Sequence, residues 1–186
     1  PVTVKIRTGY AQNDLSDLTD LVRRHEDAGI SAIFIHGRTC KQMYSGEIDY
    51  TSIREVKNAV SIPVFGSGNI FSPELAKKMF DETGCDGITV ARGALGMPWI
   101  FKDIENYLKT GKLTKPKNIT DKKRTALTEH IRYVKKYRER SSEGNVGFMK
   151  KITMWYTKGF PDARNIRNKI CKIKNNDQLS DFIKNL

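Results

Sequence analysis

The sequence predicts an α/β region over residues 1–110, followed by a smaller, basic, all-helical region. In the first region, short β-prone segments alternate with amphipathic helical segments at intervals of roughly 25 to 30 residues, which is typical of parallel strands with right-handed crossovers. Two of the connecting loops are rich in glycine. Charge divides the chain as well, since residues 1–110 hold 13 Lys+Arg and 14 Asp+Glu, whereas residues 111–186 hold 20 and 7.

The first two strands and their helices follow from simple patterns. Residues Val2–Ile6 alternate and predict a strand. Leucines at helical spacing then continue to Gly29, which ends the first helix. Ala32–Ile35 is nearly all apolar, as expected of a strand covered on both faces. A polar loop over residues 36–48 leads to Asp49, the expected N-cap of the second helix.

The third strand opens at Pro63, which cannot donate a hydrogen bond inside a ladder. Gly66 and Gly68 follow it and allow a turn that comes close to a bulky group. Ser72 is placed as the N-cap of the next helix and Pro73 as its first residue. The pattern therefore predicts a strand, a loop of small residues and a helix N-terminus, an arrangement that suits an anion.

The fourth strand, Gly87–Val90, ends in a second glycine loop, Val90–Gly96, which contains Arg92. Two successive loops of this kind predict a phosphate-binding site, which we call the phosphate cup. In eight-stranded (β/α) barrels the phosphate lies on the loops after the last two strands, and such barrels need about 250 residues. An open four-stranded sheet is one interpretation, and the C-terminal half of a (β/α)8 TIM barrel is the favoured one.

A helix after Trp99 closes the first region, and residues 111–119 are interpreted as a linker. The helical region is expected over residues 120–186. Its first helix begins at a cap provided by Thr120 or Asp121, runs to about Arg140, and is separated by Ser141–Asn145 from a second helix at about Val146–Tyr156. The third helix, after Gly159–Pro161, carries Ile166, Ile170 and Ile173 on one face, and a short fourth one spans Gln178–Ile183.

Composition narrows the class of protein. No apolar run approaches the roughly 20 residues of a membrane-spanning helix, and no segment resembles a signal peptide. Three distant cysteines, Cys40, Cys85 and Cys171, predict reduced thiols in a cytoplasmic protein. The chain begins at Pro1 inside a predicted strand, which suggests a fragment. The basic region is expected to bind a polyanion, with RNA favoured over a merely solvated basic face.

Several side chains are candidates for chemistry at the strand ends. Lys5 either holds the electron-rich edge of a flavin ring or a phosphate, or extends from a strand end into solvent. His36 either donates to a cofactor or phosphate, or is a locally bonded loop histidine. Arg38 either contacts a phosphate or pairs with Glu47 or Asp49. The proposed phosphate cup consists of Ser67, Gly68, Asn69, Ala91, Arg92 and Gly93.

Cys40 and the pair Tyr133 and Tyr137 each have a purely structural interpretation beside a functional one. Cys40 has no base beside it in the sequence and is interpreted as an inert thiol. Tyr133 and Tyr137 lie one helical turn apart and could stack on RNA bases, although such a pair more often packs in the seam of a helical bundle. The cations around the two tyrosines are Arg132, Lys135, Lys136, Arg138 and Arg140.

Taken together, the motifs resemble the tRNA-dihydrouridine synthase family, and most closely its bacterial branch with a basic helical C-terminal domain. The motifs that carry this resemblance are Val4–Gly9, His36–Thr39, Gln42–Gly46, Gly66–Ile70, Ala91–Phe101 and Trp155–Pro161.

The resemblance implies an FMN enzyme that reduces the C5=C6 bond of a uridine in tRNA and uses NADPH to reduce the flavin again. It implies that Lys5 holds the isoalloxazine and that His36 lies beside the cofactor. It also implies that Ser67, Gly68 and Asn69, with Ala91 and Arg92, bind the FMN phosphate. The family transfers hydride to C6 and protonates C5 from a cysteine, on a base flipped out of the tRNA.

The chain departs from the family pattern in three ways. Members usually have Asn-Gly-Asp where this chain has Ser67-Gly68-Asn69, and often Asn in place of Met97. The first half-barrel, with a flavin loop and the catalytic cysteine, has no counterpart, and no cysteine here matches that role. We therefore expect no catalytic residue in this chain and no turnover by it alone. Half a barrel has two open strand edges and an uncovered apolar inner face, so we expect that the isolated chain pairs with another copy, aggregates, or was cut from a longer protein.

Two other functions are compatible with parts of the sequence. Another FMN or phosphate-binding barrel, such as a dihydroorotate-type oxidoreductase, would share the phosphate cup but would not explain the basic region. A non-catalytic RNA-binding module would explain the basic region without a flavin.

Overall fold

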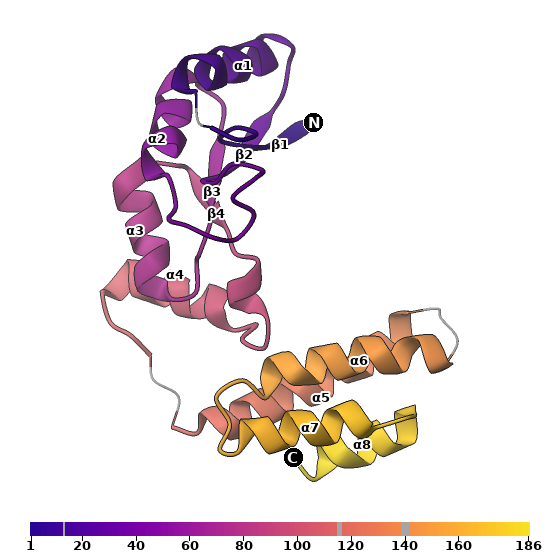
Figure 1. Ribbon diagram of the computed structural model, residues 1–186. Coiled ribbons are helices and arrows are strands. Elements are labelled where there is room, and N and C mark those ends of the chain that lie inside the picture. The colour runs from indigo at the N-terminus through magenta and orange to yellow at the C-terminus, as the bar shows by residue number, and fades with distance from the viewer. Residues whose placement is uncertain (13, 115–116, 139–141) are drawn as a thin grey trace. The chain divides into compact units, whose positions relative to one another are not determined.

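The computed structural model describes residues 1–12, 14–114, 117–138 and 142–186, and these divide into two compact units (Figure 1). Unit 1 comprises Pro1–Gly93 and Ile100–Leu113, and unit 2 comprises Ala94–Trp99 and Thr114–Leu186.

Unit 1 is an α/β structure built on one parallel sheet, as the alternating pattern predicts. Its strands are β1 (Thr3–Arg7), β2 (Ala32–His36), β3 (Val64–Ser67) and β4 (Gly87–Thr89), and they pair in the order of the sequence. The helices α1 (Leu15–Asp27), α2 (Tyr50–Ala59) and α3 (Pro73–Thr83) connect them, and α4 (Ile100–Thr110) packs on α3. Because each crossover has the same hand and moves to the next strand, the helices cover one face of the sheet (Figure 1).

The two faces of the sheet have different environments. Ile33, Ile35 and Val64 are fully buried on the face that meets the helices. On the opposite face, Phe34 and Phe65 stack with ring centroids 4.7 Å apart, and both side chains are only partly buried. The expectation that β2 is covered on both faces is confirmed in part, because Ala32 and His36 are buried on this second face whereas Phe34 is partly exposed. Its apolar composition reflects a ring stack on the second face rather than a second layer of helices.

The predicted caps of unit 1 are confirmed. Asp49 Oδ1 accepts a hydrogen bond from the Ser52 amide at 2.9 Å, and Ser72 Oγ accepts one from the Leu75 amide at 3.3 Å. Pro73 occupies the first turn of α3. Each cap satisfies one of the orphan amides of a helix N-terminus and so fixes where the preceding loop ends.

Unit 2 consists of α5 (Ile119–Tyr137), α6 (Ser142–Tyr156), α7 (Ala163–Lys172) and α8 (Asn176–Lys184). Helix α6 packs against the other three. None of the helices in the described parts of the chain is long and apolar enough to span a membrane. The core consists of Leu127, Ile131, Val134, Met149, Ile152, Tyr156, Leu179 and Ile183.

Two boundaries in unit 2 differ from the prediction. The N-cap of α5 is Asn118, rather than Thr120 or Asp121, because its Oδ1 accepts hydrogen bonds from the amides of both those residues, at 3.1 and 3.2 Å. Helix α6 begins at Ser142, within the predicted break Ser141–Asn145, and Asn145 is buried, so packing overrides its weak helix propensity. The predicted end of the first helix at Arg140 lies outside the described residues.

The segment Ala94–Trp99 belongs to unit 2, although residues 1–110 were expected to form one part. Gly96 explains this grouping. It has a φ of 75°, and a β-carbon at this position would collide with the carbonyl oxygen of Trp155 at the end of α6. Only glycine permits so close an approach of the two backbones.

Candidate functional site

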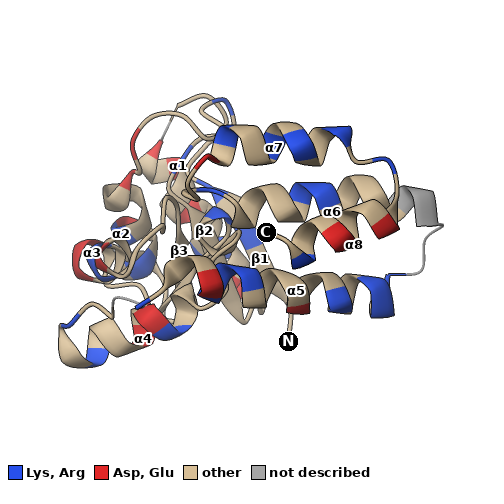
Figure 2. Cartoon of the chain, turned by 90° about the horizontal axis from the view of Figure 1, so that it is seen from below, with Lys and Arg blue, Asp and Glu red and all other residues tan. Residues whose placement is uncertain are grey.

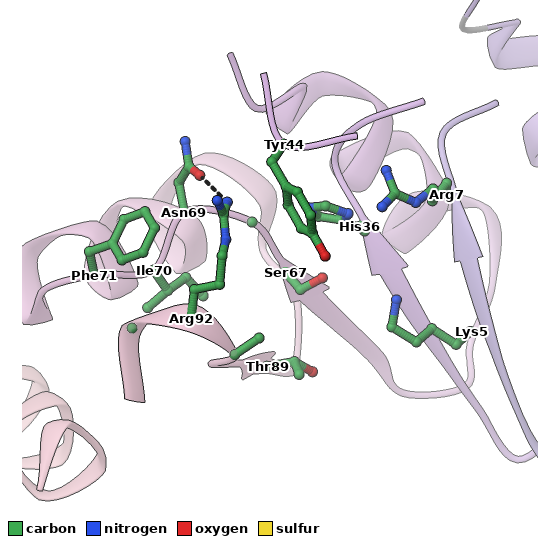
Figure 3. A pocket seen from close by; sticks show the side chains of 13 residues that line it. Lys5, Arg7, His36, Tyr44, Ser67, Asn69, Ile70, Phe71, Thr89 and Arg92 are labelled. Atoms are coloured by element: carbon green, nitrogen blue, oxygen red, sulfur yellow. Dashed lines mark hydrogen bonds between the residues drawn. The ribbon is translucent and has the colours of Figure 1, made fainter. Parts of the chain in front are cut away.

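One row of side chains crosses all four strands at their carboxyl ends. Arg7 on β1 is in register with His36 on β2, His36 with Ser67 on β3, and Ser67 with Thr89 on β4. Residues in one row of a parallel sheet point to the same face, so these four side chains converge. They line a pocket of about 190 Å³ on the face opposite the helices (Figure 3).

All seven residues that the sequence predicts for cofactor binding line this pocket. Lys5 reaches it from β1, one row below Arg7, and the others come from the strand ends and the two glycine loops. The complete set is Lys5, His36, Ser67, Gly68, Asn69, Ala91 and Arg92.

Arg92 is held from three directions. Its guanidinium lies 4.4 Å from the ring centroid of Tyr44 and 5.3 Å from that of Phe71. Its Nη2 donates a hydrogen bond to Asn69 Oδ1 at 3.1 Å (Figure 3). Two aromatic faces and one amide oxygen therefore fix an exposed cation at the mouth of the pocket.

Arg38 supports this arrangement from inside the protein. Its side chain is 1% exposed, and its Nη1 donates to the same Asn69 oxygen at 3.2 Å while its Nη2 donates to the Gly46 carbonyl. Burial lowers the pKa of Arg38, and the nearby Arg92 and Arg7 lower it further. Because Arg38 does not line the pocket, its role here is to hold the loops of Gly46 and Asn69 rather than to contact a ligand.

His36 is a neutral imidazole at neutral pH. It is 9% exposed, and its pKa falls to about 4, first because of burial and then because Arg7, Lys5, Arg38 and Arg92 surround it. A neutral ring has one N–H donor and one acceptor nitrogen. His36 can therefore donate one hydrogen bond into a pocket where, in the part of the chain that the structure describes, the other charged side chains are all positive.

The glycines allow the loops to pack tightly. Gly68 has a φ of 139°, and a β-carbon there would collide with Ile48, whereas one on Gly93 would collide with the carbonyl oxygen of Ile70. Gly66 serves the core instead, since a β-carbon on it would lie 2.9 Å from Met79 Sδ. The bulky group that Gly66 accommodates is thus a helix side chain and not a ligand.

Five lining residues were not predicted, namely Arg7, Tyr44, Ile70, Phe71 and Thr89. Arg7 follows Lys5 by two positions, so the two-residue period of a strand was a usable signal for it. Its Nη1 donates to the carbonyl oxygens of Thr39 at 2.8 Å and Met43 at 3.3 Å, which ties β1 to the 36–48 loop. Tyr44 and Phe71 come from loops whose paths the pattern does not specify.

The cysteines play no part in this pocket. Cys40 and Cys171 are exposed, Cys85 is buried, and none of the three lines it. Within the described residues, no group of His, Cys, Asp and Glu is suited to hold a metal ion.

Basic residues recur along the helices of unit 2 (Figure 2). Their side chains divide into structural and exposed ones. Lys123 is 9% exposed and donates through Nζ to the Lys158 carbonyl, while Lys150 Nζ donates to the carbonyl oxygens of Cys171 at 2.8 Å and Ile173 at 2.9 Å. By contrast, the arginines and lysines of α7 are exposed, and that helix contains no acidic residue. An exposed, acid-free basic helix is typical of nucleic-acid contacts.

Comparison with known proteins shows the family of this chain. The family model for dihydrouridine synthases (Dus) matches residues 1–185. The chain is 38% identical over 177 residues to tRNA-dihydrouridine synthase B of Pseudomonas aeruginosa, covering 95% of this chain and 52% of that protein. It is 41% identical over 167 residues to the protein of the same name from Pseudomonas syringae, covering 90% and 48%.

The protein of this name from Escherichia coli K12 is 45% identical over 132 residues, which cover 71% of this chain and 40% of that protein. The chain thus spans about half the length of the curated relatives it matches. Because the family model covers nearly every residue, both units are included in the match. The chain belongs to the dihydrouridine synthase family.

Proposed function

We propose that this chain forms part of an FMN-dependent, NADPH-linked tRNA-dihydrouridine synthase, which reduces uridine to 5,6-dihydrouridine in tRNA. The observation that carries the proposal is the convergence of Lys5, Arg7 and Arg92 on one pocket, which is lined by no acidic side chain among the described residues. Such a donor set fits the phosphate of a flavin mononucleotide.

The donors that line this pocket would suit the phosphate and the ring of FMN. Arg92 and the backbone amides of residues 67–69 and 91–93 would hold the phosphate, and Lys5 would face the isoalloxazine ring. The Ser67 hydroxyl donates to the Ile35 carbonyl at 3.2 Å, so Arg92 and the amides carry most of the binding. When bound, FMN supplies the hydride chemistry that reduces the uracil C5=C6 bond. The neutral His36 would help to orient the bound group by donating one hydrogen bond to it.

The sheet fits the C-terminal half of a (β/α)8 barrel. Four parallel strands pair in sequence order, the helices cover one face, and the other face carries the Phe34–Phe65 stack and the pocket. In a closed barrel this second face points inward. We place the cysteine that protonates C5 outside this chain, because none of its three cysteines lines the pocket.

The helical domain, residues 120–186, would bind the tRNA backbone. Residues 111–186 hold 20 Lys+Arg against 7 Asp+Glu, and the exposed side chains among them supply the cations for phosphate contacts. Affinity for tRNA should therefore fall steeply with salt concentration.

The test is a titration of FMN, followed by flavin fluorescence, into this chain alone and mixed with the complementary half of a related synthase. We expect saturable binding that Arg92→Ala abolishes. The matched control is Arg23→Ala, which removes an exposed arginine of α1. A folded mixture that binds no FMN, or an Arg92→Ala variant that binds it normally, would refute the proposed cofactor site.

A further inference from the structure

The outward face of α5 carries a stacked pair of exposed aromatic rings. The ring centroids of Tyr133 and Tyr137 lie 6.0 Å apart with an interplanar angle of 15°. Tyr133 is 50% exposed and Tyr137 is 66% exposed. The opposite face of the same helix places Leu127, Ile131 and Val134 in the core. The interpretation of this pair as a bundle seam is therefore wrong, since both rings lie outside the packed interior.

Cations flank the two rings. The Arg132 guanidinium lies 4.7 Å from the ring centroid of Tyr133, and Lys136 Nζ lies 5.1 Å from that of Tyr137. Glu129 accepts from Arg132 Nε at 3.1 Å and from its Nη2 at 2.7 Å, which orients the guanidinium. From residue 130 to residue 138 the helix has no acidic side chain. The result is an aromatic platform with positive charge at its edges.

Such a surface matches an unpaired nucleotide better than a duplex. Nucleobases stack on tyrosine rings and on guanidinium planes, and each stacked base strengthens binding. A duplex keeps its base faces stacked inside the helix and offers mainly its phosphates and sugars. The lysine ammonium over an exposed ring is a weak contact that a base can displace.

We propose that Tyr133 and Tyr137 form a stacking platform for an unpaired RNA nucleotide, a proposal that rests on the assignment of tRNA as the substrate. A base stacks on the Tyr137 ring, and Lys136, displaced from that ring, meets the adjoining phosphate. The region that follows residue 110 is strongly basic, and RNA is a polyanion. This charge complementarity favours RNA as the occupant over a protein surface with few acidic residues.

The experiment measures binding of the full chain to a fluorescently labelled short oligouridylate and to an RNA duplex of equal length, by anisotropy at fixed salt. For the double variant Tyr133→Ala/Tyr137→Ala we expect about ten-fold or greater loss of affinity for the single strand and little change for the duplex. The double Tyr→Phe variant should bind the single strand within about two-fold of the unaltered chain, because it keeps both rings. The matched control is Tyr10→Ala, since Tyr10 is 73% exposed and has Lys41 Nζ 5.7 Å from its ring centroid.

A double alanine variant that is folded by circular dichroism and binds the single strand normally would overturn the platform but leave the proposed function intact. An unaltered chain that binds neither RNA would refute both. Ultraviolet crosslinking of the unaltered chain to oligouridylate gives a readout that does not depend on variant folding. We expect crosslinks at residues 133–137, and crosslinks confined to other segments would also overturn the platform. Loss of self-association in the variant, with RNA binding unchanged, would assign the rings to a second copy of the chain.

Discussion

The side-chain oxygen of Asn69 accepts a hydrogen bond from Arg92 Nη2 at 3.1 Å, and this contact links the two loops of the pocket. The same oxygen accepts from the buried Arg38 at 3.2 Å. Asn69 has a φ of 50°, a left-handed conformation that Asn and Asp tolerate better than other residues. One amide oxygen thus serves two guanidinium groups that would otherwise repel each other.

Asn69→Ala should lower the free energy of unfolding of unit 1 by about 1–3 kcal/mol, because Arg38 loses a buried acceptor. Asn69→Asp should raise it, since a carboxylate accepts from both guanidinium groups and offsets their charges. Urea denaturation of the two variants measures this difference. Equal stability of the two variants would show that the oxygen does not hold the arginines together.

His36 makes stability depend on pH. Its pKa is about 4 in the folded protein and near 6.5 in the unfolded chain, so the unfolded state binds more protons between these values. Stability is therefore fully present above pH 6.5 and is lost as pH falls toward 4. We expect a loss of up to about 2 kcal/mol between roughly pH 6.5 and 5.

The control for this pH dependence is His36→Gln. Burial also lowers the pKa of His130, so part of the acid destabilisation belongs to unit 2 and persists in the variant. The difference between the two denaturation profiles isolates His36. Identical profiles would mean that His36 titrates near its ordinary pKa.

The sequence predicted the elements of unit 1 well because it contains strong helix-capping and helix-start residues. Asp49, Ser72 and Pro73 stand where helices begin, and the alternation of strands with helices specified a parallel sheet. The pocket residues followed from the same logic, since loops after parallel strands meet at one edge. That all seven predicted cofactor residues line one pocket reflects this topology.

What the sequence could not predict depends on tertiary contacts. Tyr44 and Phe71 flank Arg92 only because two loops fold toward each other. The cap of α5 was misplaced because Asn118, Thr120 and Asp121 are all good caps within one turn, and local propensity does not choose between them. The exposure of Tyr133 and Tyr137 required knowledge of which face of α5 meets α6.

Two glycine substitutions should act in opposite directions. Gly93→Ala should destabilise unit 1 by more than about 2 kcal/mol and weaken FMN binding, because the new methyl group collides with the Ile70 carbonyl oxygen.

Gly147→Ala should stabilise unit 2 by roughly 0.5–1 kcal/mol, because Gly147 lies inside α6 and a β-carbon there meets nothing within 4 Å. Thermal denaturation by circular dichroism compares them, and a stable Gly93→Ala protein would disprove the tight approach.

The exposed and the buried basic residues of unit 2 should have different effects on the salt dependence of RNA binding. Arg164→Gln/Arg167→Gln removes two exposed charges of α7, and the slope of log affinity against log salt concentration should fall by up to about 2, with stability unchanged. Lys123→Met should instead destabilise unit 2 by about 1 kcal/mol, because the Lys158 carbonyl loses its donor, and should leave the slope unaltered. Burial lowers the pKa of Lys123 and the side chain points into the bundle, so it is in no position to meet a phosphate. If Lys123→Met reduced the salt-dependence slope while the α7 substitutions left it unchanged, the RNA would bind a different face of the helical unit.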